Sequence, residues 1–208
     1  VQHFAALPHT EVIALSRNLT KMQAQFQQTN VRCYALDISQ NVVHQIDELQ
    51  LHGPFDILIN NAGLLINKPF ETLTHQDFSE SYQVNVIGIM EATQALLPSL
   101  APNAHIVNIS SMGGFQGSLK FAGLAAYSTS KAALCAFTEL FAEEYKHTNI
   151  HMNCLCLGAV QTEMLAAAFP GYTAPTTPTE MADFIADFAL HSGAFFNGKI
   201  LPVSSTNP

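Results

Sequence analysis

Positive charge is scarce in this chain. Eight Lys and Arg residues stand against sixteen Asp and Glu residues, which gives a formal net charge of −8. Binding to nucleic acid or to an anionic membrane relies on clusters of basic side chains, so we expect neither partner. The sequence also lacks a run of about 18 apolar residues and a signal peptide at its start. Both absences predict a soluble, cytoplasmic protein.

Cysteine is rare as well, and its spacing shows no metal-binding pattern. The four thiols are Cys33, Cys135, Cys154 and Cys156. Cys154 and Cys156 lie two residues apart in an apolar run, so on a strand they point to the same face, which is not a spacing of metal ligands. The nine histidines form no paired motif either. We predict structural thiols in a reducing compartment and no metal site.

Charged residues make up only 12% of the sequence, whereas hydrophobic residues make up 48%. This balance is typical of an α/β protein whose sheet is buried on both faces, and 208 residues suffice for one domain with a substantial core. Short apolar runs alternate with helical patterns, as in βαβ units. The predicted strands cover residues 11–16, 31–36, 56–60, 105–109, 151–157 and 199–204. The main predicted helices cover 19–28, 42–51, 74–97 and 125–146.

Two further features lie toward the C-terminal end. Thr177, Pro178 and Glu180 predict a helix start, because a capping threonine and a glutamate three residues later form a capping box and proline suits the first helical position. The stretch 163–177 is the least regular, with two prolines and a glycine. We expect it to be either a lid over a pocket or an ordered surface loop.

Tyr127 and Lys131 form the most informative motif. Residues four apart share one helix face, so the Lys131 cation can lower the pKa of the Tyr127 phenol. Ser111 lies sixteen residues before Tyr127, and an acidic phenol beside a serine hydroxyl is a suitable proton donor to a carbonyl that receives hydride. Asn85 and the segment Asn60-Asn61-Ala62-Gly63 come earlier in the chain.

In this order and rough spacing, the motifs resemble those of the short-chain dehydrogenase/reductase family, and the resemblance extends over residues 11–203. It implies one NAD(P)-binding domain over 1–208, with a doubly wound parallel sheet of the Rossmann type flanked by helices. Such sheets bind the dinucleotide outside the carboxyl ends of their strands, where Asn60, Ser111 and Gly158 are predicted. Three histidines offer a rival base but belong to no motif: His75, His105 and His147.

The resemblance also implies residue roles. Tyr127 is the general acid in reduction or the base in alcohol oxidation, and Lys131 lowers its pKa and holds the nicotinamide ribose. Ser111 hydrogen-bonds the substrate oxygen as charge develops there, and Asn85 anchors a water that links Lys131 to solvent. Besides Tyr127 and Lys131, the expected cofactor contacts are Arg17, Asp37, Ile38, Asn60, Ala62, Gly63, Gly158, Val160 and Thr162.

The chain departs from the family pattern in two places. The separation of Ser111 from Tyr127 is about three residues longer than usual, so Ser110 or Ser118 could replace Ser111. Leu157-Gly158 stands where the family has Pro-Gly after the fifth strand. We expect Gly158 to keep the close backbone approach there, Val160 to present its amide to the carboxamide, and Thr162 to contact the carboxamide or pyrophosphate.

The end of the first predicted strand indicates which dinucleotide binds. An acidic residue at that position binds both ribose hydroxyls and repels a 2′-phosphate. Here Ser16 takes its place and Arg17 follows, offering a fork of donors suited to phosphate, unless Arg17 is only a solvated strand-end residue. Asp37 and Ile38 resemble the family's adenine clamp. We therefore predict NADP(H) as cofactor, in preference to NAD(H).

The family's glycine-rich turn, with a strand before it and a helix after it, is missing from the sequence. The chain starts with residues that resemble the end of that helix. In the strand order 3-2-1-4-5-6 the missing strand is the central one, and its loss exposes two apolar sheet edges. We expect an N-terminally incomplete domain, with about 15–20 residues upstream.

The predicted function is NADP(H)-dependent hydride transfer to a carbonyl or from a secondary alcohol of a small molecule. A non-catalytic protein that senses a dinucleotide on the same fold is the alternative. The two long helices resemble those that pair family members into homodimers or homotetramers, and a broad apolar face of 125–146 supports pairing: Ala132, Leu134, Phe137, Leu140 and Phe141. Apolar pocket candidates are Met112, Phe115, Phe121, Met164, Leu165 and Phe169.

Overall fold

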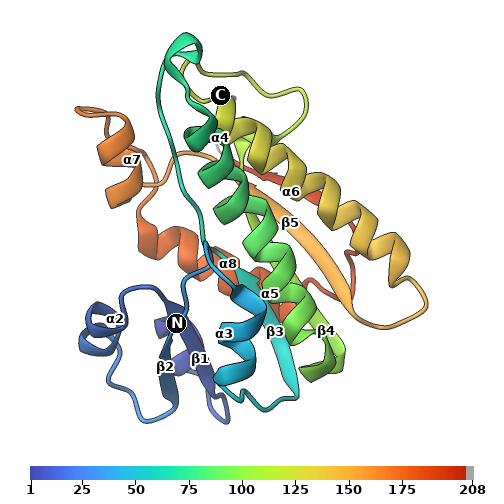
Figure 1. The fold of residues 1–208 in the computed structure, drawn as a ribbon. Coiled ribbons are helices and arrows are strands. Elements are labelled where there is room, and N and C mark those ends of the chain that lie inside the picture. Colours follow the sequence, from blue (N-terminus) through green and yellow to red (C-terminus); the bar gives the residue numbers. More distant parts are fainter. Residues whose placement is uncertain (205–208) are drawn as a thin grey trace.

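The computed structural model describes residues 1–204, and the strands in this range pair in parallel. They form two sheets, β1-β2 and β3-β4-β5-β6. Helices cover both faces of the larger sheet (Figure 1), so the predicted doubly wound α/β fold is confirmed. The strands are β1 (Val12–Ser16), β2 (Val31–Ala35), β3 (Phe55–Asn60), β4 (Leu100–Ser111), β5 (His151–Leu157) and β6 (Ile200–Val203).

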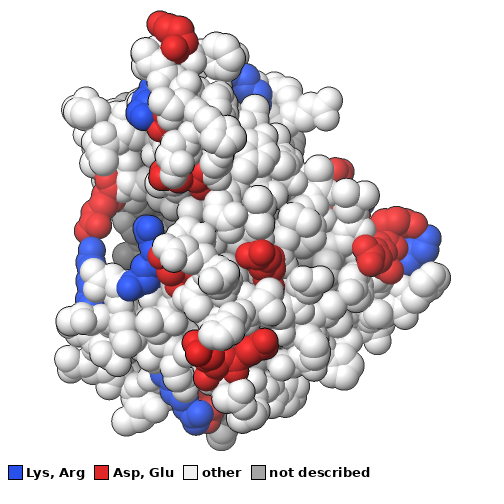
Figure 2. Space-filling model, viewed as in Figure 1, with Lys and Arg blue, Asp and Glu red and all other residues white. Residues whose placement is uncertain are grey.

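The helices alternate with these strands along the chain. They are α1 (Gln2–Ala5), α2 (Leu19–Gln25), α3 (Val42–Glu48), α4 (His75–Tyr82), α5 (Gly88–Leu96), α6 (Ala125–Glu144), α7 (Glu163–Ala168) and α8 (Pro178–His191). None of the helices in the described part of the chain is long and apolar enough to cross a membrane. On the face shown in Figure 2, basic side chains are few and lie near acidic ones, without a broad basic patch.

The side chains of β4 and β5 alternate between the two faces of the larger sheet, and a different helix covers each face. Ile106 of β4 and Met152 of β5 pack with Phe141 of α6, whereas Val107 of β4 and Leu155 of β5 pack with Phe188 and Ala189 of α8. Successive side chains of a strand point to opposite faces, so both faces of these inner strands are buried. This double burial explains why their sequences are almost continuously apolar.

A separate apolar cluster joins the two sheets. Val42 and Ile46 of α3 pack with Ala92 and Leu96 of α5. Leu15 of β1 and Leu58 of β3 pack against the same cluster. The contact between α3 and α5 therefore connects β1-β2 to the larger sheet through side chains.

No ladder connects β1 with β3 among residues 1–204. The two observed sheets, β2-β1 and β3-β4-β5-β6, keep the strand order that the sequence predicts around a missing central strand. Each of the two facing strands therefore has an edge whose backbone groups make no ladder within the described chain. Such an edge is a template for pairing with another strand.

The structure differs from the predicted elements in three places. The helix predicted over 74–97 is interrupted by a π-helical turn at Gln83–Ile87. The strand predicted over 105–109 extends over Leu100–Ser111, because it pairs with β3 on one side and with β5 on the other. Part of the irregular stretch 163–177 is helical, since Thr162 Oγ1 accepts from the Leu165 amide and caps α7.

The predicted start of α8 is confirmed in detail. Thr177 Oγ1 accepts from the Glu180 amide at 3.3 Å, and a Glu180 carboxylate oxygen accepts from the Thr177 amide at 2.8 Å. Pro178 occupies the first turn. Each group satisfies a backbone donor that the start of a helix leaves free.

Candidate active site

Tyr127 and Ser111 meet where α6 begins above the end of β4. Ser111 is the last residue of β4, and its Oγ accepts from the Gly113 amide at 3.1 Å. Burial raises the pKa of Tyr127, and a hydrogen bond with Ser111 opposes that rise. The phenol therefore stays protonated at neutral pH and lies beside a serine hydroxyl.

The two alternative serines have other partners. Ser110 is buried, and its Oγ donates to the Lys131 carbonyl at 2.9 Å. Ser118 Oγ donates to the carbonyls of Met112 and Phe115 within its own loop. Of the three serines considered from the sequence, Ser111 is the one whose hydroxyl lies against Tyr127.

Glycines bring the loop after β4 against α6. A Cβ added at Gly114 would lie 2.6 Å from the Lys131 carbonyl carbon, and one at Gly113 would lie 2.8 Å from Ser128 Oγ. Gly114 has no room for a side chain, and a side chain at Gly113 would displace the Ser128 hydroxyl. The stretch 116–122, farther along the same loop, is largely exposed.

Lys131 is only 4% exposed, and its Nζ donates to the Ile109 carbonyl at 2.8 Å. Burial lowers the pKa of Lys131 to about 8. Burial of the phenol is the largest influence on Tyr127 and raises its pKa. That Lys131 lowers the pKa of Tyr127 stays a prediction.

Asn85 lies in the π-helical turn and is fully buried. Its Oδ1 accepts from the Leu64 amide at 2.7 Å, and its Nδ2 donates to the Leu64 carbonyl and to Ser130 Oγ, both at 2.9 Å. A Cβ on Gly63 would lie 3.4 Å from Lys131 Nζ and 3.5 Å from Asn85 Oδ1. The π turn, a feature common at functional sites, thus brings Asn85 and Lys131 to the loop that follows β3.

Asn60 turns away from that loop into the protein interior. Its Nδ2 donates to Thr93 Oγ1 at 3.1 Å and to Asn108 Oδ1 at 2.8 Å. Asn108 Nδ2 in turn donates to Thr138 Oγ1 at 2.9 Å. This network connects α5, β3, β4 and α6. No sequence motif indicates this network, because each member is an isolated polar residue within an apolar run.

The predicted cofactor residues of the N-terminal part lie at the ends of β1 and β2. Arg17 is exposed. The pKa of Asp37 is lowered, mainly by a hydrogen bond from Ser39 and to a smaller extent by the charge of Arg17. The loop carrying Ile38 lies against α5, since a Cβ on Gly88 would stand 2.1 Å from the Ile38 carbonyl oxygen. Gly88 thus lets this loop approach α5 closely, although no sequence motif marks this glycine.

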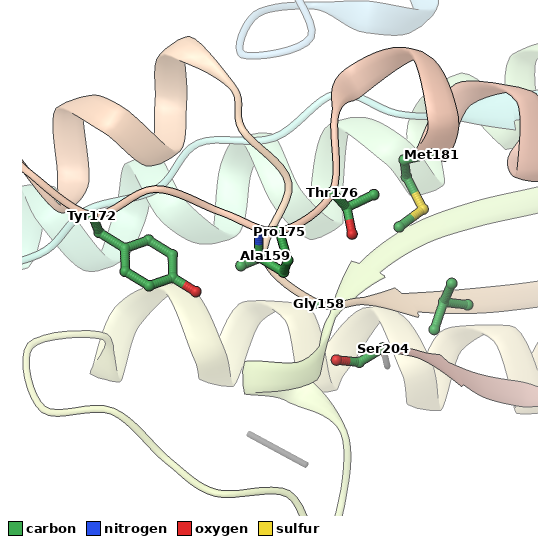
Figure 3. Close-up of a pocket in the computed structure, with 8 residues that line it drawn as sticks. Gly158, Ala159, Tyr172, Pro175, Thr176, Met181 and Ser204 are labelled. Carbon is green, nitrogen blue, oxygen red and sulfur yellow. The ribbon is translucent and has the colours of Figure 1, made fainter. Parts of the chain in front are cut away.

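Gly158 lies beside a small hollow at the carboxyl ends of β5 and β6 (Figure 3). A Cβ there would come within 2.7 Å of Ser204 Oγ, so the chain after β6 packs closely on Gly158. Val160 forms a bridge with Thr176, and Thr162 caps α7. The other residues around the hollow are Ala159, Tyr172, Pro175, Thr176, Met181, Val203 and Ser204.

Other candidates from the sequence lie elsewhere. Met112 and Phe115 pack against buried cysteines, whereas Phe121 and Met164 are exposed. His105 is a core residue with both ring nitrogens bonded, Nδ1 to the Ala189 carbonyl at 2.9 Å and Nε2 to the Asn153 side-chain amide at 3.0 Å. Its pKa is lowered by burial.

The comparison with known proteins identifies the family. The profile of the short chain dehydrogenases matches residues 2–173. The chain belongs to the short-chain dehydrogenase family. An acetoacetyl-CoA reductase of Acinetobacter is 27% identical over 194 residues, which cover 86% of this chain and 77% of the relative. A ketoacyl reductase of Nostoc is 34% identical over 139 residues, 64% of this chain and 47% of the relative. This chain thus spans about half the length of the Nostoc protein.

A solved structure shows the same likeness. A putative short chain dehydrogenase of Escherichia coli, complexed with NADPH, superposes with a TM-score of 0.79 at 26% identity. The superposition covers 92% of this chain and 85% of that one. Family membership and the parallel, helix-flanked sheet are therefore shown by sequence and by structure.

The buried amide network generates a stability prediction. Asn108→Ala removes the acceptor of Asn60 and the donor to Thr138, and each buried group left unpaired costs about 1–3 kcal/mol. We expect the free energy of unfolding to fall by about 2–4 kcal/mol, measured by urea denaturation. In Asn67→Ala, which removes a surface bond to the Ala168 carbonyl, it should fall by less than about 1 kcal/mol. Equal losses of unfolding free energy in the two variants would contradict a large contribution of the network to stability.

Proposed function

We propose that this protein is an NADP(H)-dependent oxidoreductase that interconverts a carbonyl and a secondary alcohol of a small molecule. The observation that carries the proposal is the arrangement at the start of α6. The hydroxyls of Tyr127 and Ser111 lie together. Buried Lys131 follows Tyr127 by one turn of α6, and both Lys131 and Asn85 lie close to Gly63. These are an acid, an oxygen-binding hydroxyl, a cation and an anchored amide within one region.

In reduction, Tyr127 donates its proton to the substrate oxygen, and its raised pKa keeps that proton in place at neutral pH. Ser111 donates a hydrogen bond to the same oxygen as negative charge develops there. Lys131, with a pKa of about 8, is mostly protonated at neutral pH and stabilises the charge left near Tyr127. Asn85 holds the Leu64 backbone and Ser130 in place around Lys131.

The residues present fit a nicotinamide dinucleotide. When bound, that cofactor supplies or accepts the hydride. A side chain at Gly63 would contact Lys131 Nζ and Asn85 Oδ1, so this glycine keeps both polar groups uncovered for the ribose and nicotinamide. We assign Ala62, Gly63, Val160 and Thr162 to the nicotinamide half and Arg17, Asp37 and Ile38 to the adenosine half. The side chain of Asn60 is committed to Thr93 and Asn108, so we assign it to supporting this loop.

The substrate class follows from the relatives. Those with a stated activity include reductases of ketoacyl groups and of acetoacetyl-CoA, so acetoacetyl-CoA is the first substrate to test. We also propose a cytoplasmic location, where the described cysteines, all four free, stay reduced.

Tyr127→Phe tests the reaction. It removes the acid and keeps the ring, so we expect turnover of acetoacetyl-CoA with NADPH to fall by about 10²–10⁴-fold while NADPH binding is kept. Turnover is followed by NADPH absorbance and binding by calorimetry. Tyr145→Phe is the matched control, because Tyr145 stacks on Phe141 at the far end of α6, and its turnover should equal that of the unmodified protein. Full turnover in Tyr127→Phe would refute the assigned acid.

Arg17→Ala tests the choice of cofactor. A charge-assisted hydrogen bond contributes about 1.5–3 kcal/mol, so NADPH affinity should fall about 10- to 100-fold while NADH affinity stays the same. The matched control is the chain's other arginine, Arg32, which pairs with Glu11 at 3.4 Å on an exposed face. Arg32→Ala should leave both affinities unchanged. A preference for NADH in the unmodified protein would overturn the assignment to NADP(H).

We further propose that the protein pairs into a homodimer or homotetramer through α5 and α6. Of the apolar residues suggested from the sequence, Leu134 and Phe141 are buried against the sheet, whereas Leu140 is 69% exposed. Ile87 and Met90 are 43% and 42% exposed just before and on α5. These residues supply an apolar surface that pairing would cover.

Light scattering on the protein at micromolar concentration tests the pairing. We expect a multiple of the monomer mass, which shifts toward the monomer in Leu140→Glu because a buried charge opposes association. The control Leu119→Glu changes a residue that is 66% exposed in the loop before α6 and should keep the oligomer. A monomer mass for the unmodified protein would contradict the proposal.

A further inference from the structure

Three cysteines from two elements meet beneath the candidate active site. Cys135 Sγ of α6 lies 3.6 Å from Cys156 Sγ and 3.9 Å from Cys154 Sγ, both of β5. The three sulfur atoms lie within 4.8 Å of one another. Cys154 and Cys156 point to the same face because they are two apart on a strand, and α6 packs on that face. We call these three residues the thiol cluster.

The separations within the thiol cluster match those of sulfur atoms around one metal ion. Thiolates bound tetrahedrally at about 2.3 Å from an ion lie about 3.8 Å from each other, and in a flat three-fold arrangement about 4.0 Å. The two separations from Cys135 Sγ, 3.6 and 3.9 Å, are close to these values. An ion therefore fits among the three sulfur atoms with small side-chain adjustments.

The surroundings of the thiol cluster favour a soft ion. Met112, which is 9% exposed, belongs to the same apolar cluster and brings a thioether. Ser110 Oγ lies 3.5 Å from Cys135 Sγ. Within the described residues, the ligand group contains no imidazole or carboxylate. Thiolate and thioether ligands select soft ions, Cu(I) among them, over ions that prefer oxygen ligands.

The charges near the thiol cluster also favour the binding of a metal cation. Ligation requires each thiol to release its proton to solvent, which leaves negative charge in a buried place. Lys131 carries a positive charge one turn before Cys135 and interacts electrostatically with all three cysteines. A cation bound among the sulfur atoms, together with Lys131, offsets the charge of the thiolates.

We propose that Cys135, Cys154 and Cys156 form a binding site for one soft, thiophilic metal ion, with Cu(I) as the ion that fits best. Binding exchanges protons for the ion and transfers no electron. The proposal goes beyond the proposed oxidoreductase function, since none of its three ligands is a residue assigned to substrate or cofactor. No local sequence motif indicates this site, because Cys135 lies 19 residues before Cys154.

The test is an anaerobic titration of the reduced protein with Cu(I) against a competing Cu(I) chelator. We expect one tightly bound Cu(I) per chain, counted by elemental analysis. Cys135→Ala and Cys156→Ala should each weaken binding by at least about 100-fold, beyond the loss caused by changing a residue that only supports a ligand. Cys33→Ala is the matched control, because Cys33 lies on β2 away from the cluster, and it should bind as the unmodified protein does.

Circular dichroism of each variant checks that it is folded, and X-ray absorption of the Cu(I)-loaded unmodified protein gives an answer without any variant. Three sulfur neighbours around the ion support the site. Nitrogen or oxygen neighbours, binding that survives Cys135→Ala and Cys156→Ala, loss of binding in Cys33→Ala, or no tight binding at all would each overturn it.

Discussion

Buried hydrogen bonds between α6 and β4 are the constraint on which the rest of the site depends. Lys131 Nζ donates to the Ile109 carbonyl, Ser110 Oγ donates to the Lys131 carbonyl, and Asn108 donates to Thr138. Because each buried partner is costly to leave unpaired, these bonds set the position of the helix along the strand. That position places Tyr127 beside Ser111 at one end of the contact.

The same contact sets the electrostatic conditions of the site. Burial beneath the loop after β4 raises the pKa of Tyr127 and lowers that of Lys131. Both shifts favour the neutral form of the side chain, the protonated phenol of Tyr127 and the free amine of Lys131, because burial penalises charge. The glycines after Ser111 make this burial feasible, since a side chain at Gly114 would push the loop away from α6. Packing therefore determines proton affinity here more than the charge of Lys131 does.

Much of the fold was predictable from local patterns. The alternation of apolar strands with helices, and the capping box at Thr177 and Glu180, predicted elements that the structure contains. The π turn around Asn85 and the helix α7 within 163–177 were not predicted. A π turn inserts one residue into a stretch whose sequence is helical on both sides. The turn is stabilised by the contact of Asn85 with Leu64, which is distant in sequence.

By itself, the sequence determined the order of the elements, the family and the candidate residues of the site, because these depend on the spacing of residue types along the chain. Only the tertiary structure decided that Ser111 lies beside Tyr127, that Asn60 supports the interior, and that Cys135 meets Cys154 and Cys156. The physical reason is that these outcomes depend on how α6 lies across β4 and β5. Desolvation and long-range contacts between packed elements are properties of that crossing.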